Sequence, residues 1–221
     1  MKRLLAVTGA VMVAVHLGGH LAGWPMLVLG PAGAAVLLAA ARRAGLSWAE
    51  LGLARADLPR GVRYAAPWMA GTAAVYLAGL AIPASRGAFL DERYRAGYVL
   101  SALVLVPVST VLFEEVAFRG VLWSAARELW GDRSATLLSA GLFGLWHVLP
   151  SLTMARSNPV AGGGPAVITV AGTVVATSLA GYVFCELRRR SGSLAAPALV
   201  HWTINGLGIL AAGIALQVVG R

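Results

Sequence analysis

Several apolar stretches reach the roughly 20 residues that a membrane-spanning helix needs, and they constrain the fold of this chain more than any other feature. Hydrophobic residues make up 58% of the 221 residues and charged residues only 12%. Soluble domains have about 45–50% apolar and about 25% charged residues. The sequence therefore predicts an all-α, polytopic bundle of transmembrane helices.

We expect about seven spanning helices and no soluble domain. The predicted spans are 4–22, 25–41, 64–85, 97–130, 134–149, 166–187 and 194–219. A short interfacial helix is expected at 46–53, where apolar and polar positions mix. We divide this single membrane domain into an N-terminal helical hairpin with the interfacial helix (1–63) and an intramembrane core (64–221). The first span follows two basic residues, as in a signal peptide, but no clear cleavage site follows it, so we expect a retained helix.

The formal net charge of +9 has its origin in loop arginines. A soluble chain with this charge could bind nucleic acid, but no basic face with stacking aromatics is visible, so no nucleic-acid partner is expected. Twelve basic residues fall on one predicted side of the membrane and five on the other. The positive-inside rule then places the N-terminus in the cytoplasm. The twelve are Lys2, Arg3, Arg42, Arg43, Arg55, Arg60, Arg63, Arg127, Arg133, Arg188, Arg189 and Arg190, and the five are Arg86, Arg93, Arg95, Arg156 and Arg221.

Two acids and an arginine interrupt the fourth predicted span. An ionisable group at membrane depth costs roughly 2.5–3.5 kcal/mol on insertion scales unless it is paired or faces water. Glu115 and Arg119 are four residues apart, so they share a helix face and are expected to form an ion pair. Glu114 is turned about 100° away from Glu115 and is left to face the bundle interior. The alternative is a buried three-residue network without chemistry.

Further polar groups lie in later spans. His147 lies near the end of the fifth hydrophobic stretch, and a lone membrane histidine is more often a packing residue than a catalyst. His201 and Asn205 share one face of the seventh predicted span. From the rise per residue, Glu114 and His147 lie at similar heights and His201 somewhat lower. We therefore expect the three polar groups to meet in one pocket in the cytoplasmic half of the membrane.

A carboxylate, two imidazoles and an amide in a dry cavity suit the chemistry of an activated water molecule. A buried glutamate can take a proton from water, and a histidine can orient or relay it. His201 and Asn205 could donate to a developing oxyanion, where each donor contributes roughly 3 kcal/mol. No serine, cysteine or aspartate shares these faces in a nucleophile–base arrangement, so a covalent acyl route is not expected. The one cysteine, Cys185, excludes a disulfide framework and a thiolate metal cluster.

Together, the three motifs resemble those of the CPBP intramembrane proteases. That family includes the type II CAAX prenyl proteases and the bacterial lysostaphin-resistance and bacteriocin-immunity (Abi) proteins. The resemblance covers about 64–209, and 51–53 also looks like the family. The matching positions are Glu114, Glu115 and Arg119 of Glu-Glu-x-x-x-Arg, Phe143 and His147 of Phe-x-x-x-His, and His201 and Asn205 of His-x-x-x-Asn.

The resemblance implies an endopeptidase with a cytoplasm-facing site, acting on a peptide or protein substrate that is hydrophobic or prenylated. It implies that Glu114 and His147 activate water and that His201 and Asn205 stabilise the oxyanion. Glu115, Arg119 and Phe143 would then support the site. The bias towards Arg, Ala and Gly favours a GC-rich genome, and we expect an integral protein of a bacterial cell membrane.

Cofactor use has two readings. The preferred one needs no cofactor. The alternative is an open tetrahedral zinc site on Glu114, His147, His201 and water, although no second shell that would orient the histidines can be identified. His16 and His20 are four apart on the first span and could add metal ligands or a substrate contact, but packing against neighbouring helices is the simpler explanation.

Two other functions stay open. The first alternative is a non-catalytic bacteriocin-immunity or membrane scaffold protein on the same fold. The second is a proton-coupled carrier, because intramembrane carboxylates and histidines also build proton relays. No inverted repeat or broken helix pair supports a carrier. The identity of the substrate and the oligomeric state are not encoded in any pattern recognised in the sequence.

Overall fold

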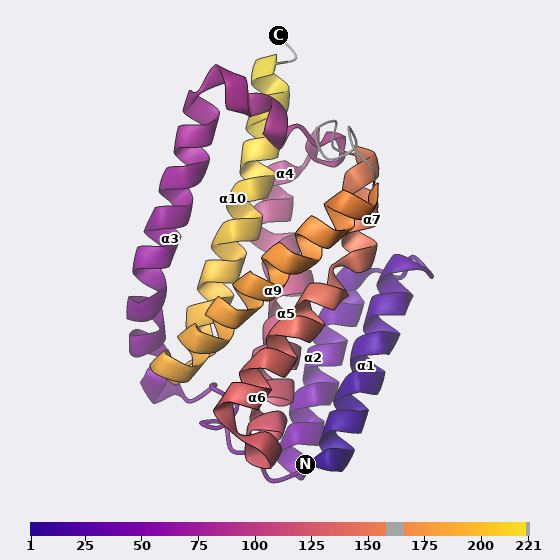
Figure 1. Ribbon diagram of the computed structural model, residues 1–221, viewed down its shortest axis with the longest axis vertical. Helices are drawn as coiled ribbons and strands as arrows, with labels where there is room; N and C mark the ends of the chain where they lie inside the picture. Colours follow the sequence, from indigo (N-terminus) through magenta and orange to yellow (C-terminus); the bar gives the residue numbers. More distant parts are fainter. Residues whose placement is uncertain (158–165, 220–221) are drawn as a thin grey trace.

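The computed structural model describes residues 1–157 and 166–219, and all regular elements in these ranges are helical, which confirms the expected all-α bundle (Figure 1). The helices in chain order are α1 (Lys2–His20), α2 (Met26–Arg43), η1 (Arg55–Asp57), α3 (Leu58–Ala81), η2 (Pro83–Phe89), η3 (Glu92–Tyr94), α4 (Tyr98–Leu100), η4 (Ser101–Leu105), η5 (Pro107–Val111), α5 (Leu112–Glu115), η6 (Val116–Leu122), α6 (Trp123–Trp146), α7 (Val148–Ser157), α9 (Ala166–Ser191) and α10 (Ala195–Val219).

Five helical stretches within the described residues are long and apolar enough to cross a bilayer, or six when α3 and η2, bent by 114°, count as one span. One of the five, Tyr98–Thr153, is 56 residues long and turns back at Gly131 (Figure 1). Gly131 has φ 78° and ψ 171°, a conformation that glycine adopts readily because it lacks a Cβ. The expected count of seven depends on dividing this stretch at Gly131 and remains a prediction.

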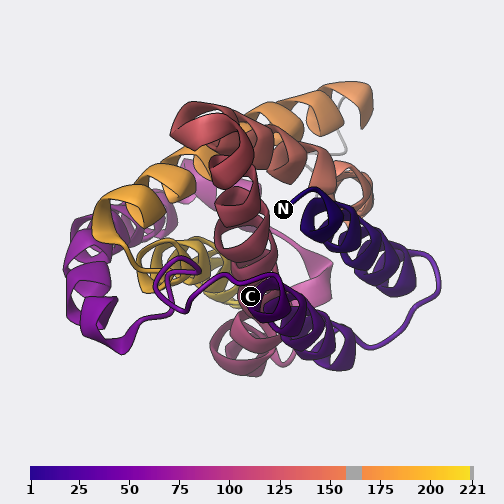
Figure 2. The ribbon, with the colours of Figure 1, turned by 90° about the horizontal axis from the view of Figure 1, so that it is seen from below.

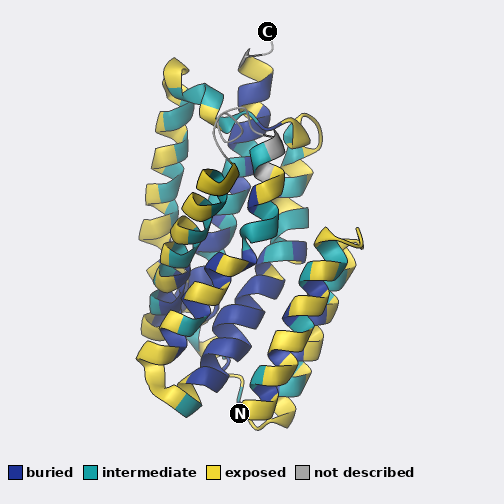
Figure 3. Ribbon diagram, turned by 45° about the vertical axis from the view of Figure 1, so that its right-hand side comes forward, coloured by how far each residue is buried: buried dark blue, intermediate teal, exposed yellow. Residues whose placement is uncertain are grey.

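The fourth predicted span is the central element of the bundle. Every residue from 113 to 126 is buried. Figure 2 shows this helix in the middle, with α1 and α2 on one side and α3 on another, and Figure 3 shows the buried residues concentrated on it. Three of its parts, η4, η5 and η6, are π-helical, and α5 with the two acids lies between η5 and η6. π-Helical turns are rare and are frequent at functional sites.

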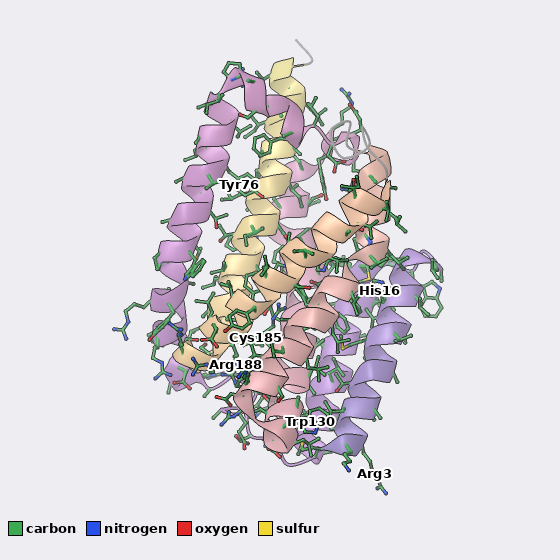
Figure 4. All side chains as sticks on the ribbon, viewed as in Figure 1. Arg3, His16, Tyr76, Trp130, Cys185 and Arg188 are labelled. Carbon is green, nitrogen blue, oxygen red and sulfur yellow. The ribbon has the colours of Figure 1, made fainter. Side chains whose placement is uncertain are left out.

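The loops at the N-terminal end of the molecule are tied together by backbone acceptors. Arg188 Nη2 donates to the carbonyl of Glu50 at 2.7 Å, and Arg60 Nε donates to the carbonyl of Ser191 at 2.6 Å. Arg3 and Arg188 lie towards this same end (Figure 4), and the C-terminus lies at the opposite end (Figure 1). This arrangement agrees with the predicted sorting of the loops. Which end faces the cytoplasm remains a prediction.

The prediction of an interfacial helix at 46–53 is wrong. The segment forms hydrogen-bonded turns, and both Leu46 and Leu51 are buried in the core. Ser47 and Glu50 close the turn reciprocally, with Ser47 N donating to Glu50 Oε2 at 2.7 Å and Glu50 N donating to Ser47 Oγ at 3.2 Å. The mixed pattern reflects leucines that point into the protein rather than towards lipid.

One hydrophobic core joins the N-terminal hairpin to the other helices. Val15 of α1 and Leu37 of α2 are buried in the same cluster as Phe113 and Phe118 of the central helix. The division expected at residue 63 falls within α3, which runs without interruption from Leu58 to Ala81. The hairpin is therefore packed against the helix that carries the two acids.

Candidate active site

Glu115 connects the central helix to α10 through one oxygen atom. Its Oε1 accepts from Arg119 Nη1 at 3.1 Å, which confirms the predicted ion pair. The same Oε1 lies 2.8 Å from Nδ1 of His201. A carboxylate paired with arginine acts as an acceptor, so Nδ1 of His201 donates. All three side chains are at most 3% exposed, so this network lies wholly inside the bundle.

Aromatic rings enclose the buried guanidinium. The Arg119 Cζ atom lies 4.0 Å from the ring centroid of Phe143 and 4.9 Å from that of Phe184. A desolvated cation–π contact contributes about 2 kcal/mol. The same two rings flank His201: Phe184 stacks on it at 5.2 Å, and Phe143 meets it edge-on at 5.7 Å. Phe143 therefore supports both the arginine and the histidine, as the resemblance implied.

Glu114 is held by a tryptophan. Its Oε1 accepts from Trp146 Nε1 at 2.9 Å. Its Oε2 is buried, has no hydrogen-bond partner among the described residues, and lies 3.7 Å from Nε2 of His201. The carboxylate is therefore fixed by one oxygen and presents the other to the imidazole of α10. This confirms the sequence expectation that Glu114 and His201 lie close together.

His147 follows directly after Trp146 and is half-buried. Its Nδ1 lies 2.7 Å from the carbonyl oxygen of Phe143. Because a carbonyl can only accept, Nδ1 must carry the proton, and the neutral ring then has its lone pair on Nε2. Between the described side chains, the structure shows no hydrogen bond from His147 to Glu114. His147 is thus near the carboxylate along the chain fold but is not bonded to it.

Close packing of α6 on α9 places the residues of the Phe143–His147 motif. A Cβ atom at Gly144 would lie 2.7 Å from the carbonyl oxygen of Val174 and would also meet Ser178 Oγ. No larger residue can occupy this position without moving the backbone of α9. Gly144 thereby lets the ring of Phe143 approach Phe184 and Arg119.

Asn205 lies one helical turn beyond His201 and is half-buried. Its side chain makes no hydrogen bond to another described residue, and it is not in contact with either glutamate. It faces a cavity of about 530 Å³ that extends away from the carboxylates. The polar residues lining this cavity are Tyr76, Asp91, Tyr94, Thr110 and Asn205.

The zinc alternative requires three side chains around one centre. Within residues 1–157 and 166–219, no group of three His, Cys, Asp or Glu side chains is placed to hold a metal ion. His201 instead directs its Nδ1 to Glu115. The residues therefore do not fit the tetrahedral site considered from the sequence, and the chemistry is derived from the side chains alone.

Two residues of the site were missed at the level of sequence. A buried indole N–H needs an acceptor, so Trp146, next to a motif histidine, carried a usable signal. Phe184 carried none, because an aromatic residue in an apolar span is ordinary. Its position against Arg119 and His201 depends on how α9 crosses the central helix.

The comparisons with known proteins agree with this geometry. No curated protein and no solved structure matches the chain. A family model described as type II CAAX prenyl endopeptidase Rce1-like matches residues 96–207, more than half of the chain. The matched range contains all seven motif residues and begins later than the resemblance expected from residue 64. The chain is therefore an integral membrane protein that belongs to the type II CAAX prenyl endopeptidase Rce1-like family, and its general activity is that of an intramembrane endopeptidase.

Proposed function

We propose that this protein hydrolyses a peptide bond of a membrane-associated substrate with a water molecule activated by Glu114 and His147. The observation that carries the proposal is the state of Glu114. Trp146 holds Oε1, whereas Oε2 is buried and unpartnered within the described chain. Such an oxygen is suited to accept a proton from water as the water oxygen attacks the substrate carbonyl carbon.

His147 is the second member of this pair. The bond from its Nδ1 to the Phe143 carbonyl leaves Nε2 as an acceptor that can orient the water. When the tetrahedral intermediate collapses, the carbon–nitrogen bond breaks. The proton taken by Glu114 is then returned to the leaving amine nitrogen, so that the carboxylate is regenerated.

His201 and Asn205 are proposed to stabilise the oxyanion. Nδ1 of His201 is already bonded to Glu115, so donation to substrate must come from Nε2. His201 therefore serves as a donor only when both ring nitrogens are protonated, between the carboxylates of Glu114 and Glu115. The Asn205 amide makes no bond to another described residue and faces a cavity, so its N–H groups are free for a substrate carbonyl.

A hydrophobic or prenylated substrate is supported by a second cavity. It measures about 370 Å³ and lies between α3, α10 and η4. Its lining is almost entirely apolar, and it includes Met69, Ala70, Ala73, Leu103, Leu207 and Leu210. We also propose that the protein resides in a bacterial cell membrane with a cytoplasmic N-terminus, as the loop charges favour.

The test is cleavage of a membrane-anchored peptide by purified protein in lipid. Glu114→Gln and His147→Ala should each lower kcat by about 10²–10⁴-fold, the typical contribution of a general acid or base. His201→Ala should lower kcat by about 10²–10³-fold, as for loss of an oxyanion donor. Glu128→Gln, the same change at an exposed position of the central helical run, should leave kcat unchanged.

Full activity in all three site variants would contradict the proposal. An immunity assay then separates the alternative: a non-catalytic immunity or scaffold protein would still protect cells as Glu114→Gln. A metal-free reaction further predicts that chelator-treated protein, with its metal content measured directly, keeps its cleavage rate. Loss of activity that only Zn²⁺ restores would instead support the zinc reading.

A further inference from the structure

Helix α1 lies outside the residues matched by the family model, yet it reaches the site. The ring centroid of His16 lies 4.2 Å from that of Trp146, with the planes tilted by 45°. His20, one turn later, lies 4.8 Å from His16. Both α1 histidines interact electrostatically with His147, and His20 also does so with Glu114. The simple expectation that these histidines only pack against neighbouring helices therefore misses contacts with the motif residues.

The indole of Trp146 is enclosed on several sides. Phe113 and Phe118 of the central helix contact it at centroid distances of 5.9 and 5.6 Å. His16 contacts it from α1. These rings fix the plane of the indole, and that plane sets the direction of the Nε1–H bond to Glu114. A chain of contacts thus runs from His16 through Trp146 to the carboxylate.

An imidazole at this place is not explained by packing alone. Nδ1 of His16 is buried and has no hydrogen-bond partner among the described residues. Leaving a buried polar atom unpaired costs about 1–3 kcal/mol, so an apolar side chain would be the more stable choice for packing. The helix itself is held firmly, because Met12 and Val15 are buried in the main core.

We propose that His16 is a positioning residue for the reaction: its ring orients Trp146, and Trp146 aims Glu114 at the water. This proposal rests on the proposed function for its effect on catalysis. It does not make His16 a catalytic residue, because His16 acts on Glu114 only through the indole.

The kinetic test compares ring removal with ring replacement. His16→Ala should lower kcat by about 10- to 100-fold with little change in KM, because small misplacement of a reacting group has effects of this size. His16→Phe keeps a flat ring on Trp146 and should restore most of kcat. Val13→Ala, an exposed position on the same helix, is the control and should have wild-type kcat.

Wild-type kcat in His16→Ala would overturn the proposal, as would an equal loss in His16→Ala and His16→Phe. If His16→Ala lowers the thermal midpoint, His16→Leu takes its place, because leucine fills the space without a flat ring. Recovery by phenylalanine but not by leucine is then the expected result.

A second measurement does not depend on cleavage. In protein with ¹⁵N-labelled indoles, the Trp146 N–H signal is assigned by its loss in Trp146→Phe. It should shift in His16→Ala and in Glu114→Gln, and it should stay unchanged in Val13→Ala. An unshifted signal in His16→Ala overturns the positioning role even if Glu114→Gln is inactive. Conversely, full activity of Glu114→Gln ends the proposed function while the indole signal still tests the contact.

Discussion

His201 and Glu115 are joined across two helices by a 2.8 Å contact between Nδ1 and Oε1, and Arg119 bonds to that same oxygen. The glutamate–arginine pair of the central helix is therefore not a separate structural feature. It fixes the imidazole that the mechanism uses, and it determines which ring nitrogen of His201 remains for the substrate. Disturbing any one of these three residues should disturb the other two.

Removing Glu115 should strongly destabilise the fold. Glu115→Ala leaves the buried Arg119 guanidinium without its carboxylate, and breaking a buried pair in this way costs about 3–5 kcal/mol. Unfolding of the purified protein in detergent, followed by circular dichroism, measures the loss. The matched control is Glu92→Ala, which breaks the solvent-exposed pair with Arg95 and should cost about 0–1 kcal/mol. Equal losses in the two variants would contradict the structural role of the buried pair.

Gly144 and Gly141 offer a second comparison on one helix. A Cβ atom at Gly144 would meet the backbone of Val174, so Gly144→Ala should destabilise by about 1–3 kcal/mol, as overpacking does. A Cβ atom at Gly141 would meet nothing within 4 Å, so Gly141→Ala should be neutral or stabilise by about 0.5–1 kcal/mol through helix propensity. Thermal midpoints of both variants check this. Similar midpoints would show that α6 and α9 are not in close contact at Gly144.

The turn at 46–53 should give the fold a dependence on acid. Hydrogen bonds from the Ser47 hydroxyl and backbone N–H lower the pKa of Glu50 below its usual 4.5. Because the folded pKa is the lower one, the stabilisation is present above the unfolded pKa and is lost as pH falls through the folded pKa. Thermal midpoints from about pH 7 to pH 3 should fall less in Glu50→Gln than in wild type. Ser47→Ala should raise the pKa of Glu50, measured by carboxyl ¹³C titration. An unchanged titration would show that the turn is not closed in solution.

Orientation in the membrane can be tested with introduced cysteines, because the native Cys185 is fully buried and should not react. Lys2→Cys and Glu92→Cys place thiols at exposed positions near opposite ends of the molecule. With a cytoplasmic N-terminus, an impermeant thiol reagent should label Glu92→Cys on intact cells, and Lys2→Cys only after permeabilisation. The reverse pattern would contradict the orientation inferred from the loop charges.

Helical spacing was sufficient to predict the parts of the site that lie on one helix. Four-residue separation placed Glu115 beside Arg119, and the structure confirms that pair at 3.1 Å. Spacing could not tell which side chain of a neighbouring helix would meet Glu114, because the facing partner depends on how the helices cross. Trp146 rather than His147 makes that hydrogen bond.

Other features depended on packing that a hydrophobic pattern does not report. The pattern at 46–53 is the same whether the leucines face lipid or the core, and only the surrounding helix ends decide that they are buried. The bend of 114° after α3 divides a segment that composition alone presents as one continuous span. The π-helical turns of the central helix leave no mark on hydropathy, because they change hydrogen bonding and not residue type.

Those π-helical turns make the central helix sensitive to the number of residues it contains. A π turn accommodates an additional residue, because its hydrogen bonds run from i to i+5 instead of i to i+4. Deleting one residue within Pro107–Val111 would let that part return to α-helical bonding and would rotate everything after it by about 100° relative to what precedes it. The span would stay as apolar and nearly as long, but Glu114 and Glu115 would leave their partners and turn towards neighbouring helices or lipid. Sequence length in this helix, and not only polarity, therefore determines whether the acids meet the imidazole.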